Sequence, residues 1–194
     1  WTQGTRSAVD VFQGALFPPN LVLVDGDVRA GGELQAVLDH CRQHGLGLEL
    51  YLHHPRTGEA QRNEVTVWLS DRSPDWPLHL HMANLDLPVL LALLLTRRGG
   101  RIRLATAVRD AADEPAAERW LRQLIDMGRL PGDTRTTVLH GPILDALGRS
   151  VVRADLHLLG LGEQVDPARL DAFRQASGAA CLFLVDSGQE SLLA

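Results

Sequence analysis

Short apolar runs alternate with longer, one-sided apolar segments along most of this chain. The short runs are typical of strands buried on both faces, and they predict strands at 21–24, 48–52, 64–69, 102–108, 135–139, 156–161 and 181–185. The longer segments repeat apolar side chains every three or four positions, which predicts helices over 33–44, 87–97, 115–128, 142–148 and 167–177. This alternation favours an α/β fold of three layers, in which a mostly parallel sheet has helices on both faces.

Two of the predicted helices carry local end signals. Gly45 follows the helix over 33–44, and glycine is common just beyond a helix end. Asp166 and Pro167 stand where the helix over 167–177 needs an N-cap and a first residue. Residues 1–20 have a mixed composition and end near a Pro–Pro pair that resists helix, so we interpret them as a leading segment before the first strand.

The chain divides at a polar stretch. Residues 56–63 contain Gly58 and no apolar period, which predicts a linker. The part before it, 1–55, is expected to be a partial βαβ subdomain, and the part after it, 64–194, a five-stranded doubly wound subdomain. Two strands are too few to bury a sheet alone. The first part must therefore pack against the larger unit or against sequence beyond this chain.

Composition excludes some functions. The net charge of the 194 residues is -5, whereas nucleic acids and anionic membrane surfaces attract basic faces. The longest apolar stretch, 85–95, is far shorter than the ~20 residues of a spanning helix. We therefore expect no nucleic-acid partner and no direct membrane insertion. Cys41 and Cys181 lack zinc-site spacing and are expected to be buried, reduced thiols.

Three patterns could carry chemistry, but each has a plainer interpretation. Asp25 and Asp27 follow a strand and could hold a cation with a nucleotide sugar, or could form a turn. His79 and His81 share one face of an extended segment, as zinc ligands or as solvated side chains. Ser187 precedes a glycine after the last strand and is interpreted as a turn residue. We assign no catalytic residue, no metal ligand and no cofactor.

A glycine-containing loop follows the strand over 156–161. In universal stress proteins a glycine-rich loop at this place, running into a helix, holds ATP phosphates through backbone N–H groups. Gly160 and Gly162 could play that part here. However, Glu163 and Asp166 place negative charge where a phosphate would bind. Nucleotide binding is therefore kept as the alternative function.

The loop after the strand over 64–69 has an unusual composition. It combines Asp71, Arg72, Asp75 and Trp76 with two prolines, beyond the end of a strand where loops often carry function. A large aromatic side chain held in this way could be a docking anchor. The other interpretation is that Trp76 folds back over the core.

Four segments resemble one transporter family. Residues 65–76, 84–87 and 180–191 are similar to signature blocks of the cytoplasmic C-terminal domains of prokaryotic cation-chloride cotransporters, in the amino acid–polyamine–cation superfamily. Residues 17–20 resemble the start of the later part of that domain. The chain begins with Trp1 and shows only part of the family's first half, which indicates a fragment of a longer protein.

The resemblance implies a function without catalysis. Such domains have two halves related to the universal stress protein fold, lie on the cytoplasmic side of the cell membrane, and mediate homodimer contacts and regulation. Their transport activity belongs to the transmembrane domain of the same polypeptide. The expected function is therefore that of a soluble regulatory and dimerisation domain of a cation-chloride cotransporter.

Overall fold

The computed structural model describes residues 2–13, 19–26, 31–55, 64–73, 75–78, 85–149 and 152–192. The strands are β1 (Leu21–Asp25), β2 (Gly47–Leu52), β3 (Glu64–Leu69), β4 (Arg101–Val108), β5 (Arg135–His140), β6 (Leu156–Gly160) and β7 (Ala180–Val185). The helices are α1 (Thr2–Gln13), α2 (Gly31–Gln43), α3 (Asp86–Thr96), α4 (Glu114–Met127), α5 (Ile143–Arg149) and α6 (Pro167–Ser177), with a short 3-10 turn, η2 (Ala111–Asp113), before α4.

The strands form one sheet in the order β1-β2-β7-β6-β3-β4-β5. All neighbours are parallel except β2 and β7. The strands β3 to β7 make a parallel sheet in which the chain starts at β3, adds β4 and β5 on one side, and returns to add β6 and β7 on the other. The predicted α/β class with a mostly parallel sheet is confirmed.

The first part of the chain joins the same sheet. In the antiparallel β2–β7 pair, Leu50 lies opposite Phe183, and β1 pairs with β2 in parallel at the outer edge. The sheet of the later strands therefore continues into β2 and β1. The predicted linker, 56–63, lies outside the described residues.

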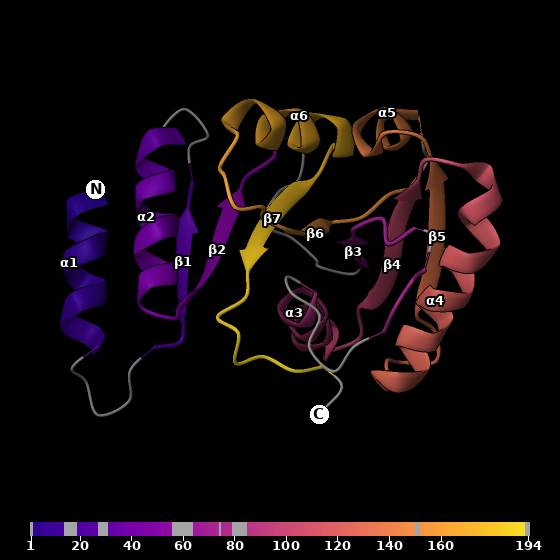
Figure 1. The fold of residues 1–194 in the computed structure, drawn as a ribbon, viewed down its shortest axis with the longest axis horizontal. Helices are drawn as coiled ribbons and strands as arrows, with labels where there is room; N and C mark the ends of the chain where they lie inside the picture. Colours follow the sequence, from indigo (N-terminus) through magenta and orange to yellow (C-terminus); the bar gives the residue numbers. More distant parts are fainter. Residues whose placement is uncertain are drawn as a thin grey trace.

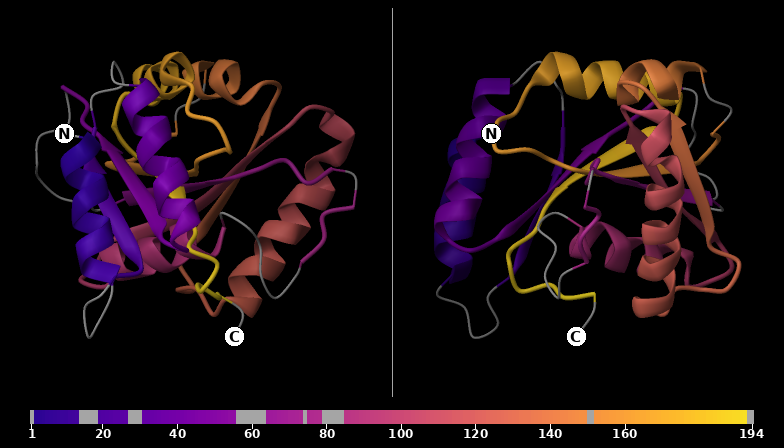
Figure 2. Two further views of the ribbon diagram at one scale, coloured as in Figure 1. Left: turned by 60° about the vertical axis from the view of Figure 1, so that its left-hand side comes forward. Right: turned by 45° about the vertical axis from the view of Figure 1, so that its right-hand side comes forward.

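Helices cover both faces of the sheet, as Figures 1 and 2 show. One core lies between the sheet and the helices α3 and α4, with Leu104 and Trp120 at its centre. The other core lies under α2, α5 and α6, and contains Leu38 and Phe173. Alternation along β3 sends Val67 to the first core and Trp68 to the second, because successive strand residues point to opposite faces.

The interpretation of residues 1–20 as a leading segment without a helix is wrong for residues 2–13. They form α1, which stands beside α2 at one end of the sheet (Figure 1). Its Val9 is buried in the core under α2, so packing of one apolar face stabilises a helix that has no acidic residue in its first turn and no basic residue in its last. The expected start of α6 is confirmed, since Asp166 is its N-cap and Pro167 its first residue.

Candidate functional site

A cleft opens where the strand order of the parallel unit reverses. The chain leaves β3 toward β4 on one side and returns to β6 on the other, and open α/β sheets bind ligands at this point, beyond the carboxyl ends of the strands. The cleft has a volume of about 770 Å³ and is lined by Ser70 and Asp71 after β3, Arg109 after β4, Gly160 at the end of β6 and Gly162 after it. We call it the switch-point cleft.

The structure brings three of the predicted site residues together in this cleft. Asp71, Gly160 and Gly162 all line it. The Asp71 carboxylate accepts hydrogen bonds from the backbone N–H of Ser73 at 2.9 Å and from the Ser73 hydroxyl at 2.7 Å. One of its oxygens is therefore engaged in shaping the turn after β3.

The remaining residues of the predicted docking loop lie outside the cleft lining. Arg72 is half-buried and Asp75 is exposed, whereas the side chain of Trp76 is only 7% exposed. Its ring packs on that of Trp120 with 5.6 Å between centroids, and the Trp120 indole N–H donates to the carbonyl of Pro77. Trp76 is thus part of the core, and it is not the exposed anchor that a docking role for its ring would need.

The loop over residues 160–166, which we call the glycine loop, is tied to α2. The guanidinium of Arg42 donates to the carbonyl of Glu163 at 2.7 Å and to that of Gly162 at 3.1 Å. The side-chain amide of Gln35 donates to the Glu163 carbonyl at 3.3 Å and accepts from the Val165 N–H at 2.7 Å. We call these four hydrogen bonds the loop clamp. They connect the first part of the chain to a loop more than a hundred residues later.

Several backbone donors near the cleft already have acceptors. The Asp166 carboxylate accepts from the N–H groups of Ala168 at 3.0 Å and Arg169 at 3.2 Å, and Pro167 has no N–H to offer. The N–H of Leu161 donates to the carbonyl of Leu184. A phosphate at the start of α6 would have to displace a carboxylate that repels it.

A buried histidine accepts a hydrogen bond from Trp68, a residue that lines the cleft. His157 on β6 is fully buried, and its Nδ1 accepts a hydrogen bond of 2.9 Å from the indole N–H of Trp68. Among the described residues its Nε2 has no hydrogen-bond partner. Burial lowers the pKa of His157 from 6.5 to about 4, since a buried imidazolium would lose its hydration. His157 is therefore neutral at physiological pH.

The two cysteines are buried, free thiols, as the sequence predicts. Burial raises the pKa of Cys41 to about 11 and that of Cys181 to about 12. A thiol in this state contains little of the thiolate that reacts with electrophiles or binds metals. Neither cysteine has the properties of a nucleophile.

The other candidate residues do not converge on the cleft. Asp25 ends β1 at the far edge of the sheet, and the following Gly26 N–H bonds to the carbonyl of Tyr51. The hydroxyl of Ser187 donates to the carboxylate of Glu190, within the tail after β7. Asp27, His79 and His81 lie outside the described residues.

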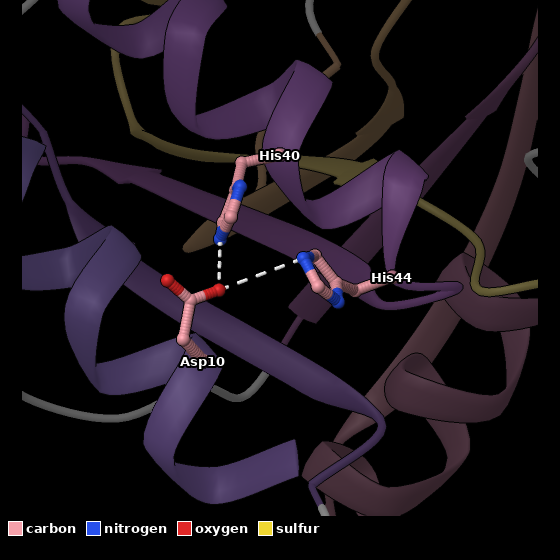
Figure 3. Close-up of side chains that lie close together, drawn as sticks. All are labelled: Asp10, His40 and His44. Carbon is pink, nitrogen blue, oxygen red and sulfur yellow. Dashed lines mark hydrogen bonds and ion pairs between the residues drawn. The ribbon is translucent and has the colours of Figure 1, made fainter.

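One cluster was missed from the sequence. Asp10 on α1 lies against His40 and His44 at the end of α2 (Figure 3). The spacing of the two histidines, four residues apart in a predicted helix, is a signal that places both on one helix face. No sequence signal indicates Asp10, because its approach depends on how α1 packs.

Comparisons with known proteins agree on one family. A family model described as "Prokaryotic cation-chloride cotransporter, C-terminal domain, 2nd" matches residues 60–193, more than half of the chain. A search of curated protein sequences gives no match. Among the described residues, no helix combines the length and apolar character that crossing a bilayer requires.

Two solved structures share the fold. The cytoplasmic domain of a prokaryotic cation chloride cotransporter matches with a TM-score of 0.86 and 22% identity, over 99% of this chain and 73% of that chain. A universal stress protein from Archaeoglobus fulgidus DSM 4304 matches with a TM-score of 0.59 and 11% identity, over 95% of this chain and 66% of that chain. These likenesses confirm the universal-stress-protein-like fold. From the family match over residues 60–193 we conclude that the chain belongs to the prokaryotic cation-chloride cotransporter C-terminal domain family.

Proposed function

We propose that this chain is a non-catalytic regulatory and dimerisation domain, located on the cytoplasmic side of the cell membrane and connected to the transmembrane domain of its own cotransporter. Membership of the family supports the connection to a transporter. The structural relative described as a cytoplasmic domain supports the location.

The loop clamp is the observation that favours this proposal over nucleotide binding. In a nucleotide-binding loop, backbone N–H groups must face the ligand. Here Arg42 and Gln35 hold the glycine loop against α2, and Asp166 satisfies the first N–H groups of α6. The glycine loop therefore connects the first part of the chain to the parallel unit, at the place where a stress protein would hold phosphates.

Nucleotide binding is the second candidate, and the switch-point cleft favours it. Its volume of about 770 Å³ is in the range of small-molecule sites. Arg109 and Arg169 also line the cleft and could neutralise phosphates. The acidic cap and the loop clamp oppose this function, so a bound nucleotide would have to rely on the two arginines.

The β1 end of the sheet is the surface that fits a second copy of this chain. In the described sheet β1 is an edge strand, and an edge strand offers unpaired backbone groups to another strand. Leu23 at the centre of β1 is 66% exposed, and it points to the same face of the sheet as Leu21, which packs on the core under α3 and α4. An apolar edge of this kind suits a self-complementary, two-fold contact.

Self-association through β1 is tested by sedimentation of the chain and two glutamate variants. The weight-average mass of the wild-type chain should rise from 21.2 kDa toward about twice that value as concentration increases. Leu23→Glu should stay monomeric, because it places a charge in the apolar contact. Leu94→Glu, at a leucine on α3 that is 61% exposed, should behave as wild type. A wild-type chain that remains monomeric, or an equal effect of both variants, would contradict dimerisation through β1.

A further inference from the structure

The α1–α2 contact carries three metal-ligating side chains that converge on one point. His40 lies in the last turn of α2 and His44 stands one residue beyond the helix end, and Asp10 approaches both from α1 (Figure 3). Asp10 Oδ1 lies 3.0 Å from His40 Nε2 and 3.6 Å from His44 Nε2. The three donor atoms lie within 4.8 Å of one another.

The backbone fixes the position of the second histidine. His44 stands at the end of α2, where helices often fray, but this end is closed by a hydrogen-bonded motif. The Leu46 N–H bonds to the carbonyl of Cys41, and the Gly45 N–H bonds to that of Arg42. Gly45 has a φ of +64°, the left-handed conformation that this motif requires. His44 is therefore presented from an ordered turn.

From this geometry we propose that Asp10, His40 and His44 form a binding site for a divalent transition-metal ion, Zn²⁺ in the first place. Two imidazoles and one carboxylate are a common protein ligand set for zinc. Tetrahedral bonds of about 2.0–2.1 Å place neighbouring donor atoms about 3.3 Å apart, and the observed separations of 3.0 and 3.6 Å lie on either side of that value. The third separation, between the two histidine nitrogens, is at most 4.8 Å, so rotation of the more exposed His44 side chain would have to bring these two donors closer.

Burial divides the roles of the three ligands. The His40 side chain is 10% exposed and is held by its packing, whereas the side chains of His44 and Asp10 are 34% and 57% exposed. An ion can thus enter from the solvent side, and a water molecule can complete the coordination there. Within the described residues, the ion-pair partners of Asp10 are the two histidines, so no arginine neutralises its carboxylate.

The consequence of metal binding is a link between two helices. Ligands from α1 and α2 on one ion fasten α1 to the edge of the domain, where Val9 is its buried apolar contact. Binding that occurs in the folded state alone raises the stability of that state. The ion therefore acts here as a structural clip.

Calorimetric titration of the tag-free chain with Zn²⁺ tests the site. One ion should bind per chain, and His44→Ala and Asp10→Asn should each weaken binding at least about tenfold, since each removes a ligand from a three-residue site. His140→Ala is the matched control, because His140 faces a single carboxylate, that of Glu114, at 3.2 Å. This variant should bind Zn²⁺ as tightly as wild type.

Thermal unfolding gives a second measurement that does not depend on heats of binding. Zn²⁺ should raise the melting temperature of wild type and of His140→Ala, and raise that of Asp10→Asn by less at the same Zn²⁺ concentration. Mg²⁺ should have no such effect, because it prefers oxygen ligands. The proposal is overturned if Zn²⁺ does not bind, if neither ligand variant weakens it, if His140→Ala weakens it equally, or if Mg²⁺ binds as tightly as Zn²⁺.

Discussion

Replacing Trp76 by alanine should lower the free energy of unfolding by about 3–5 kcal/mol, the usual cost of deleting a buried tryptophan side chain. Trp76 is 7% exposed, and its ring packs on Trp120 in the core between the sheet and the helices α3 and α4. An alanine would leave a cavity between the loop and α4. The measurement is the change in unfolding free energy in urea.

Trp76→Phe is the matched control for this substitution. The indole N–H of Trp76 is buried and has no hydrogen-bond partner among the described residues, so phenylalanine loses no hydrogen bond and should cost far less than alanine. If Trp76→Ala changed the stability by less than about 0.5 kcal/mol, as surface substitutions do, the ring would not be a core residue and the docking interpretation would return.

Acidification should destabilise the domain through His157 by about 3 kcal/mol between pH 7 and pH 4. The pKa of His157 falls from 6.5 to about 4 in the folded chain because the ring is buried. Well above pH 6.5 the imidazole is neutral in both the folded and the unfolded chain. As pH falls below 6.5, His157 binds a proton in the unfolded chain but stays neutral in the folded chain. The free energy of unfolding therefore declines until the folded imidazole also protonates near pH 4.

The contribution of His157 is isolated by comparison with His157→Asn, measured by urea unfolding at several pH values. Asparagine keeps an oxygen near the position of Nδ1 to accept from the Trp68 indole N–H, and it does not titrate. The stability difference between wild type and variant should change by about 3 kcal/mol across this pH range. Parallel curves for the two proteins would show that the folded chain accommodates a charged His157.

The sequence predicts those features that depend on local chemistry. The apolar periods give the seven strands and the helices after residue 31, and Asp166 with Pro167 gives the start of α6. The switch-point cleft depends on the strand order, which the sequence analysis did not predict. The meeting of Asp71, Gly160 and Gly162 in one cleft is therefore a finding of the structure.

Features that depend on distant packing could not be predicted. The antiparallel pairing of β2 with β7 joins segments that only the tertiary fold brings together. The helix α1 has no acidic residue in its first turn and no basic residue in its last, and its buried side depends on contact with α2. Trp76 could equally have pointed outward, since the loop sequence does not encode its packing on Trp120.

The central claim is that the glycine loop is a connection within the domain and holds no phosphate. Calorimetric titration of the chain with Mg²⁺-ATP and with AMP tests this claim most directly. The same titrations are made with the variant Gly162→Ala, because a Cβ added at Gly162 meets no atom within 4 Å and should not disturb the fold. We expect no heat of binding for either protein at millimolar nucleotide. Saturable, one-to-one binding to wild type that is weakened in Gly162→Ala would contradict the claim, because it would place a ligand against the loop.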